Sequence, residues 1–344
     1  MKIDPLVSVL TPVRNGQPYL AQCIESVLSQ SYSNFEYIIV DNCSTDDTLQ
    51  VAQKYAQQDE RIKVVSNESL LDIIANHNKA FGLISPEAQY CKIVSADDWL
   101  FPDCIEKLVS VAQSQPSVGL VNSYQLSGGS DDWRNWQIKW AEIPYPSTTL
   151  PGKEVARNFL LGGPYVFGTP TSILYRADLV RKESSFYPNA SPEADTSACI
   201  KQLAVSDFGF VHQVLSFERI HSHQQTTASK KLHAYSLAKL RDLKAYGHLF
   251  LTQREHASRE AELLHDYYAV LATSAVNFRE RSFWSHHSQR LREIGYRFDT
   301  LRLGFSVAAK LADLCLNPKQ TVEKIVRRHN NGKLSVDNQS KRAL

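Results

Sequence analysis

The chain has 344 residues, of which 43% are apolar and 22% charged, so it can bury a full-sized core and is not of the disordered class. No apolar run approaches the ~18 to 20 residues that a membrane-spanning helix needs. The net charge of +2 conceals an asymmetry, since residues 230–344 hold 21 Lys and Arg against 11 Asp and Glu, whereas the preceding residues hold 17 against 25.

The first 126 residues alternate between strand and helix periodicity. Ser44 and Asp47 form the pattern of a capping box before the second helix. Alternating strands and helices favour right-handed crossovers and a mostly parallel sheet flanked by helices, which is an α/β fold. The apolar pattern predicts strands over residues 6–13, 35–40, 61–66, 90–96 and 118–126, and helices over residues 18–30, 44–58, 70–84 and 104–114.

The sequence pattern changes twice in the rest of the chain. Residues 127–152 are rich in Gly, Ser and Pro and read as a loop, whereas nearly all of residues 230–330 has a helical pattern. Between them we expect a strand and helix over residues 172–180, a helix over 195–205 and a pair of strands over 208–221. The predicted organisation is an α/β domain (1–228) with a nucleotide-binding half (1–125) and an acceptor half (126–228), a helical C-terminal appendage (229–330) and a frayed tail (331–344).

Polar residues follow the predicted strands, at Thr11 to Asn15, at Asp41 to Ser44, and at Asp97 and Asp98. Ligands of an open parallel sheet bind at the carboxyl ends of its strands, so we expect these residues to meet. Two adjacent carboxylates repel each other unless a cation lies between them, and they suit Mg²⁺ bound together with phosphate oxygens. The sequence has neither G-x-G-x-x-G nor a Walker A motif, which argues against a nicotinamide enzyme and a P-loop NTPase.

Two segments carry a resemblance to a known family. VSVLTPVRNGQPYLAQCIESVLSQSYSNFEYIIVDNCSTDDT (7–48) resembles the N-terminal signature of family 2 glycosyltransferases, which have the GT-A fold, and KIVSADDWLFPD (92–103) resembles their acidic metal motif. The resemblance covers roughly residues 5–225. It implies an enzyme that moves a sugar, with inversion and with Mg²⁺ or Mn²⁺, from a nucleoside-diphosphate sugar to a hydroxyl of a saccharide or lipid-linked acceptor.

The resemblance also implies roles for individual residues. Thr11, Asp41 and Asn78 would contact the nucleotide. Asp97 and Asp98 would serve ribose, phosphate and metal, but Ser95 stands where many members begin this motif with an aspartate, so which of the two ligates the ion stays open. His221 and His223 are further candidates for the metal or the diphosphate.

The transfer also needs a general base for the acceptor hydroxyl. The segment SPEADTSACIKQL resembles the family's catalytic-base region and places Glu193 and Asp195 just before a predicted helix. We favour Asp195 as the base, with Glu193 as the alternative, because Ala194 separates two acids that are often adjacent in the family. A simple helix N-cap is the competing interpretation of Asp195.

Two other functions compete with sugar transfer. A nucleotidyltransferase acting on sugar phosphates also joins a parallel sheet, a nucleotide and a metal, but the glycine-rich basic loop it needs is missing from TPVRNGQPYL. A nucleotide-sugar-binding module that has lost its base is the second rival. We expect no nucleic-acid partner.

The basic C-terminal helices have alternatives of their own. Residues 301–315 predict an amphipathic helix with Leu301 and Phe305 on its apolar face and basic residues behind it. It could lie on an anionic membrane surface, pack on the α/β domain, or form a homodimer. The six scattered cysteines show no disulfide pattern and indicate a cytoplasmic protein, peripheral to the inner membrane face in the first case.

Overall fold

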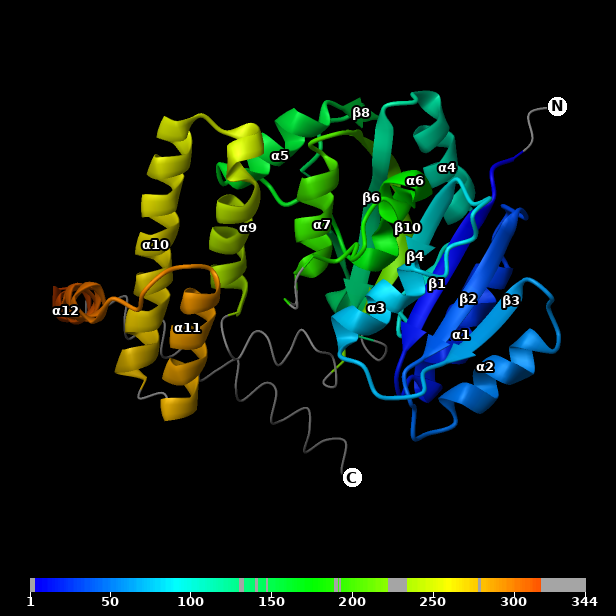
Figure 1. The fold of residues 1–344 in the computed structure, drawn as a ribbon, viewed down its shortest axis with the longest axis horizontal. Helices are drawn as coiled ribbons and strands as arrows, with labels where there is room; N and C mark the ends of the chain where they lie inside the picture. The colour runs from blue at the N-terminus through cyan, green and yellow to red at the C-terminus, as the bar shows by residue number, and fades with distance from the viewer. Residues whose placement is uncertain are drawn as a thin grey trace. The chain divides into compact units, whose positions relative to one another are not determined.

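The computed structural model describes residues 4–129, 133–139, 142–146, 148–188, 191, 193–221, 234–277 and 280–316 (Figure 1). The chain divides into two compact units, Met1–Arg259 and Glu260–Leu344, which are taken here in turn. His223 and the expected tail 331–344 lie outside the described residues.

Within the described residues, ten strands form one sheet in the first unit. They are β1 (Val7–Val13), β2 (Phe35–Asp41), β3 (Ile62–Ser66), β4 (Tyr90–Ile93), β5 (Trp99–Leu100), β6 (Val118–Gly128), β7 (Gln137–Lys139), β8 (Thr149–Leu150), β9 (Leu174–Arg176) and β10 (Asp207–Arg219). The order is β3-β2-β1-β4-β9-β6-β10-β5, with β7 beside β6 and β8 beside β10.

The long strands all run in one direction. β3, β2, β1 and β4 pair in parallel, the short β9 lies antiparallel between β4 and β6, and β6 pairs in parallel with β10. The predicted mostly parallel sheet is therefore confirmed, and the carboxyl ends of β1, β2, β4 and β10 share one edge. The expected strand pair over 208–221 is instead the single strand β10, because both of its halves pair with β6 across register shifts at Val211 and Val214.

Helices cover both faces of the sheet, as Figure 1 shows. One core holds buried residues of α1 (Gln17–Leu28), α2 (Thr48–Ala56) and α4 (Cys104–Ser114); the other holds residues of α3 (Ile73–Phe81), α5 (Gly152–Leu160), α6 (Ala177–Arg181) and α7 (Ala194–Gln202). Tyr37 and Ile39 of β2 face the first core, and Ile38 and Val40 face the second. This alternation is the period of a strand that is buried on both sides.

The predicted capping box at the start of α2 does not form. The N–H and the hydroxyl of Thr48 both donate to Asp46 Oδ1, and Asp47, at the N-cap, makes no side-chain cap bond. Ser44 Oγ instead accepts the N–H of Asn15 at 2.9 Å, which ties the loop after β2 to the loop after β1. Ser44, which was expected to cap a helix, therefore helps to shape the carboxyl edge of the sheet.

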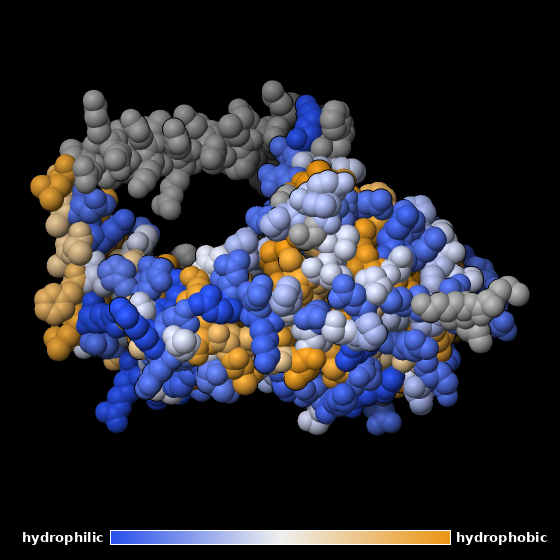
Figure 2. All heavy atoms as spheres, turned by 90° about the horizontal axis from the view of Figure 1, so that it is seen from above, coloured by the Kyte–Doolittle hydropathy of each residue, from blue (hydrophilic) through white to orange (hydrophobic). Residues whose placement is uncertain are grey.

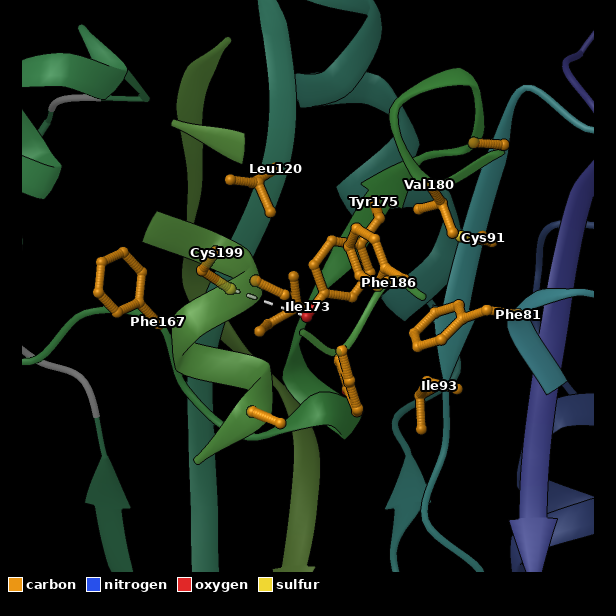
Figure 3. Packing of buried hydrophobic residues seen from close by; sticks show 14 of the residues in the cluster. Phe81, Cys91, Ile93, Leu120, Phe167, Ile173, Tyr175, Val180, Phe186 and Cys199 are labelled. Atoms are coloured by element: carbon orange, nitrogen blue, oxygen red, sulfur yellow. Dashed lines mark hydrogen bonds between the residues drawn. The ribbon is translucent and has the colours of Figure 1, made fainter. Parts of the chain in front are cut away.

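Aromatic rings fix α3 and α7 to the sheet (Figure 3). The ring of Tyr175 on β9 meets the ring of Phe186 edge-on at 5.0 Å, and Phe186 meets Phe81 of α3 at 4.7 Å. The hydroxyl of Tyr175 lies 3.8 Å from Cys199 Sγ on α7. Because all four side chains are buried, the position of α7 is set by tightly packed rings.

The first unit extends past the boundary at residue 228 that the sequence suggested. The helix α9 (Ala234–Phe250) packs on α5 and α7, so it belongs to the α/β unit. The helix α10 (Gln253–Val276) starts in the same unit, where Arg259 Nε donates to the carbonyl of Leu160 at 3.0 Å. These contacts explain why the compact unit ends at Arg259.

The second unit contains the rest of α10 together with α11 (Arg281–Glu293) and α12 (Thr300–Leu316). The hydroxyl of Tyr267 on α10 is 2.7 Å from His287 Nδ1 on α11, and the Tyr268 hydroxyl accepts the N–H of Asp299 at 2.7 Å. None of the helices in the described part of the chain combines the length and the apolar composition that crossing a membrane would require.

Candidate active site

A pocket of about 740 Å³ opens at the carboxyl edge of the sheet. Its walls come from the loop after β1 (Arg14 and Asn15), the loop after β4 (Ser95 to Asp98) and the residue pair Glu218 and His221 at the end of β10. Residues 165–170 and the first turn of α7 close the other side. The topology therefore brings together segments that are far apart in the sequence.

Asp97 presents its carboxylate to this pocket together with His221. The Asp97 side chain is 29% exposed, and its Oδ2 lies 3.0 Å from His221 Nε2. The His221 ring rests against Tyr19 of α1, with 5.1 Å between the ring centroids. A carboxylate oxygen and an imidazole nitrogen thus line the pocket side by side.

Asp98 has a different environment from its neighbour. It is 4% exposed. Its Oδ2 accepts a hydrogen bond from the hydroxyl of Thr171 at 2.6 Å, and its Oδ1 accepts one from the backbone N–H of Arg219 at 3.0 Å. Burial, followed by the charge of Asp97, raises the pKa of Asp98 well above its usual range. Unlike the partly exposed Asp97, Asp98 is buried, and its two oxygens hold the pocket walls together.

Arg219 at the end of β10 is a site residue that the sequence analysis missed. Its Nε donates to the carbonyl of Asp97 at 2.9 Å, and its guanidinium lies over the rings of Tyr19 at 4.5 Å and Trp99 at 5.0 Å. Both cation–π contacts and the hydrogen bond fix the backbone that carries Asp97. Its place two residues before His221, at a strand end, was the signal that could have identified it.

A buried lysine lies beneath the same loop. Lys92 of β4 is fully buried, and its Nζ donates to the carbonyls of Thr171 at 2.5 Å and Ile173 at 3.3 Å. Burial lowers the pKa of Lys92. The hydroxyl oxygen of Thr171 also accepts the backbone N–H of Ser95 at 3.1 Å. Thr171 therefore connects β4 and the loop after it to the segment that directly follows the pocket-lining residues Thr169 and Pro170.

Residues 162–172 (GGPYVFGTPTS), which belong to the expected acceptor half, contribute to the pocket wall. The hydroxyl of Tyr165 donates to the carbonyl of Gly168 at 2.9 Å and lies 2.8 Å from Thr196 Oγ1 on α7. Gly168 has a φ of +75°, and a Cβ there would come within 2.1 Å of Ser172 Oγ, so only glycine fits.

Glu193 and Asp195 line the same pocket as Asp97 and His221. α7 starts at Ala194 with Glu193 at its N-cap and no side-chain cap bond, so Asp195 is not the N-cap that the competing interpretation required. Burial raises the pKa of Asp195 to about 6. Burial and the charges of Asp242 and Asp195 raise the pKa of Glu193 to about 8.

Asp242 of α9 completes a group of three acids. It is 2% exposed, and its Oδ1 accepts the hydroxyl of Ser197 at 2.5 Å, one turn along α7. Burial raises the pKa of Asp242 to about 7, although the charge of Arg241 acts in the opposite direction. Nothing in the sequence marked Asp242, because an acid within a helical pattern usually faces solvent.

The structure does not bring all of the expected nucleotide contacts to the pocket. Thr11 is buried and its hydroxyl donates to the carbonyl of Val94 at 2.8 Å. The amide of Asn78 is bound to Ser185 and to both backbone groups of Tyr187. Both side chains are bonded within the protein in this structure, and neither lines the pocket.

Asp41 also lies outside the residues that line the pocket, but unlike Thr11 and Asn78 it has a spare hydrogen-bonding atom. It is buried at the end of β2, and its Oδ2 accepts the N–H of Ser44 at 3.3 Å. Its Oδ1 has no hydrogen-bond partner among the described residues. A buried carboxylate oxygen with spare capacity is the feature that a nucleotide base could use.

The described residues contain no group of three or more His, Cys, Asp and Glu side chains placed to hold a metal ion. Asp97 and His221 nevertheless fit a divalent ion in part, since they offer an oxygen and a nitrogen to the same pocket. Mg²⁺-like ions are often bound by one or two protein groups together with phosphate oxygens of the ligand. The residues present therefore suit an ion that arrives with a diphosphate.

Comparisons with known proteins identify the family of this chain. Residues 8–183 match the model of the family described as glycosyl transferase family 2. The putative teichuronic acid biosynthesis glycosyltransferase TuaG of Bacillus subtilis is 37% identical over 36% of this chain and 48% of its own length. The putative glycosyltransferase EpsE of the same organism is 33% identical over 53% of this chain and 60% of its own length. The matched segment thus spans less than two thirds of either relative.

Solved structures share the fold at low sequence identity. Staphylococcus aureus TarS 1–349 in complex with UDP-GlcNAc superimposes with a TM-score of 0.61 at 16% identity, covering 84% of this chain and 80% of that chain. The mannosyltransferase PcManGT of Pyrobaculum calidifontis, in complex with GDP-Man and Mn²⁺, gives a TM-score of 0.51 at 14% identity over 92% and 87%. These likenesses confirm the expected GT-A type fold.

The contrast between the two adjacent aspartates can be measured. Asp98→Ala should lower the free energy of unfolding by about 2 to 4 kcal/mol, because it leaves the Thr171 hydroxyl and the Arg219 N–H without their acceptor. Asp97→Ala should change it by less than ~1 kcal/mol, since that side chain is partly exposed. Urea unfolding of both variants checks this, and equal losses would contradict the assignment.

The buried acid on α9 should make stability depend on pH. Because folding raises the pKa of Asp242 to about 7, the folded state holds the proton more tightly, so wild type should lose stability as pH rises from ~4 to ~7. Asp242→Asn removes this loss. The free energy of unfolding of the variant should therefore exceed that of wild type by an amount that grows with pH, to on the order of 3 kcal/mol. Asp266→Asn, which removes an exposed carboxylate, is the control for urea unfolding across this range. A pH-independent difference for Asp242→Asn would refute the prediction.

Proposed function

Because the chain belongs to glycosyl transferase family 2, we propose that it transfers a sugar, with inversion, from a nucleoside-diphosphate sugar to a hydroxyl of a saccharide acceptor. The observation that carries the proposal is a pocket whose lining includes both the pair Asp97 and His221 and the pair Glu193 and Asp195. Asp97 and His221 suit the diphosphate end of a donor, whereas Glu193 and Asp195 suit the attacking hydroxyl of an acceptor. A relative named for teichuronic acid biosynthesis supports a cell-envelope polysaccharide as the acceptor class.

Asp97 and His221 would hold a divalent cation at the diphosphate. Such an ion, Mg²⁺ or Mn²⁺, would neutralise the charge that develops on the leaving nucleoside diphosphate. The fold neighbour in complex with GDP-Man and Mn²⁺ supports this assignment. Asp98, which was also expected to bind the metal, has the supporting role of holding the loop that carries Asp97.

The nucleotide would lie between the loops after β1 and β2. Asp41 Oδ1 has no partner among the described residues and would accept an N–H of the base. Asp97, which lines the pocket, would contact the ribose or a phosphate. Fold neighbours in complex with UDP-GlcNAc and with GDP-Man support a nucleoside-diphosphate sugar as the ligand. Thr11 would act only by connecting β1 to Val94, and Asn78 by connecting α3 to Ser185 and Tyr187.

Asp195 is the general base in this proposal. With a pKa of about 6 it is mainly ionised at neutral pH, whereas Glu193, with a pKa of about 8, is mainly protonated there. Asp195 can therefore accept the proton of the acceptor hydroxyl, and Glu193 can donate a hydrogen bond. The two acids share one environment but differ in protonation, which separates their roles.

Replacement of the two acids by amides tests these roles. Asp195→Asn should keep donor affinity and reduce turnover by ~10² to 10⁴, because the amide keeps the shape but not the basicity. Glu193→Gln should reduce it less than about tenfold, since the amide resembles the protonated acid already present. Release of nucleoside diphosphate from a panel of UDP- and GDP-sugars, with water as the acceptor, measures turnover, and thermal shifts measure binding.

The opposite order of effects would assign the base to Glu193. Full turnover in both single variants would place the base elsewhere. If wild type bound a donor and released no nucleoside diphosphate from it even with saccharide acceptors present, the binding-module alternative would hold.

Nucleotide affinity should depend on a divalent ion through Asp97. Mn²⁺ should tighten the binding of UDP or GDP to wild type, because the ion lies between two negative groups. Asp97→Ala should remove this increment and leave the weaker binding in EDTA unchanged or improved. Glu68→Ala, which removes an exposed acid of the same unit, should behave as wild type in calorimetry. An Mn²⁺ increment that survives in Asp97→Ala would place the ion at other residues.

A further inference from the structure

Asp242 lies on the buried side of α9, where an acid is unusual. Charged side chains of a protein mostly stay at the surface, and Figure 2 shows such hydrophilic residues spread over the visible face. Asp242 is instead 2% exposed, and Ala238, Leu240 and Leu243 of the same helix are buried with it. Burial of a carboxyl group costs free energy, so an acid in this place is a candidate for a role in the neighbouring site.

A hydrogen bond joins Asp242 to the first turn of α7. The hydroxyl of Ser197, which is 1% exposed, donates to Asp242 Oδ1 at 2.5 Å. The N–H of Ser197 donates in turn to the carbonyl of Glu193 at 3.1 Å. This turn carries Glu193 and Asp195, which both line the pocket, whereas Asp242 is not among the residues that line it. Asp242 thus contacts, through Ser197, the part of the fold that holds the proposed base.

The charge of Asp242 also acts on these acids. Like charges in a desolvated region repel each other strongly, which favours the protonated form of one of them. Burial is the first cause of the raised pKa of Glu193, and the charge of Asp242 is the second. Arg241 and Lys239 lower the pKa of Glu193, so α9 carries charges that act in both directions.

The other groups around Glu193 and Asp242 come from α7, α9 and the pocket wall. The titratable and charged groups are Asp195, Lys239, Arg241, Tyr246 and Tyr165. Burial raises the pKa of Tyr246 to about 12 and that of Tyr165 well above its usual range, so both stay neutral near pH 7. With pKa values of about 6, 7 and 8, Asp195, Asp242 and Glu193 lose their protons in that order as the pH rises.

We propose that Asp242 is a positioning residue for the transfer reaction. It holds the first turn of α7 through Ser197, and its negative charge keeps the proton on Glu193 after Asp195 has ionised. The range in which Glu193 donates a hydrogen bond and Asp195 accepts a proton is thereby extended to higher pH. This inference rests on the proposed sugar transfer, and it adds a residue outside the pocket that regulates the same site.

The titration of Glu193 tests the effect of the charge without any turnover. In protein labelled with ¹³C at the glutamate carboxyl groups, the signal of Glu193 is the one that Glu193→Gln removes. Asp242→Asn keeps an oxygen that can accept the Ser197 hydroxyl but removes the charge, so the midpoint of Glu193 should fall by about one pH unit. Arg241→Gln removes a positive charge and should raise the midpoint. Glu154→Gln, which removes an exposed carboxylate of α5, should leave it unchanged.

Turnover measured against pH shows whether this shift matters for the reaction. The loss of nucleoside diphosphate release at alkaline pH should begin about one pH unit lower in Asp242→Asn than in wild type. In the Glu193→Gln background the same substitution should not move the profile, because glutamine has no proton to lose. A residue that only anchored α7 would lower turnover equally at every pH.

Two results would overturn the inference. One is a midpoint of Glu193 that stays unchanged in both Asp242→Asn and Arg241→Gln, and the other is an alkaline shift that persists in the Glu193→Gln background. If the midpoint moves as expected but wild type releases no nucleoside diphosphate, the proposed sugar transfer is wrong, while the coupling between Asp242 and Glu193 is confirmed.

Discussion

The hydrogen bonds of the Asp98 carboxylate hold the active-site edge together. One oxygen binds the Thr171 hydroxyl from the segment after the pocket wall, and the other binds the Arg219 N–H at the end of β10. Arg219 in turn fixes the Asp97 carbonyl, and Lys92 fixes the Thr171 carbonyl from below. A buried carboxylate is costly unless it is fully hydrogen-bonded, so this arrangement is sensitive to the loss of any member. It leaves the neighbouring Asp97 available to the pocket, which is how two adjacent acids acquire different functions.

The pocket wall at the start of α7 contains buried acids that repel one another when ionised. Glu193, Asp195 and Asp242 share a largely desolvated region, and burial is the first cause of the raised pKa of each. A helix packed against the wall supplies the third acid, while Arg241 and Lys239 of the same helix offset part of the repulsion at Glu193. Acids with different pKa values can then divide the roles of proton acceptor and hydrogen-bond donor, at a cost in stability.

The sequence predicted the sheet and the pocket edge well, because short-range patterns determine both. Strand and helix periods predicted β1 to β4 and their helices, and strand-end polarity identified Asp97, whereas Asp195 was identified only through the resemblance to the family's catalytic-base region. Contacts between distant segments could not be read in this way. Arg219, Thr171 and Asp242 lie far from Asp97 and Asp195 in sequence, and only the packing of β10, α7 and α9 brings them together. For the same reason Thr11 and Asn78 looked like ligand contacts, although their side chains hold the protein together.

The family match ends at residue 183, whereas Asp195, His221 and Asp242 all lie beyond it. In the proposed function, the matched segment holds the nucleotide, and the segment beyond it supplies the base and sets its acidity. Changes in the second half can alter which hydroxyl is used, or the pH at which transfer proceeds, without erasing the signature. Two proteins that share this signature can thus differ in the product they make, and a name inherited through the first half says little about the glycosidic bond formed in the second.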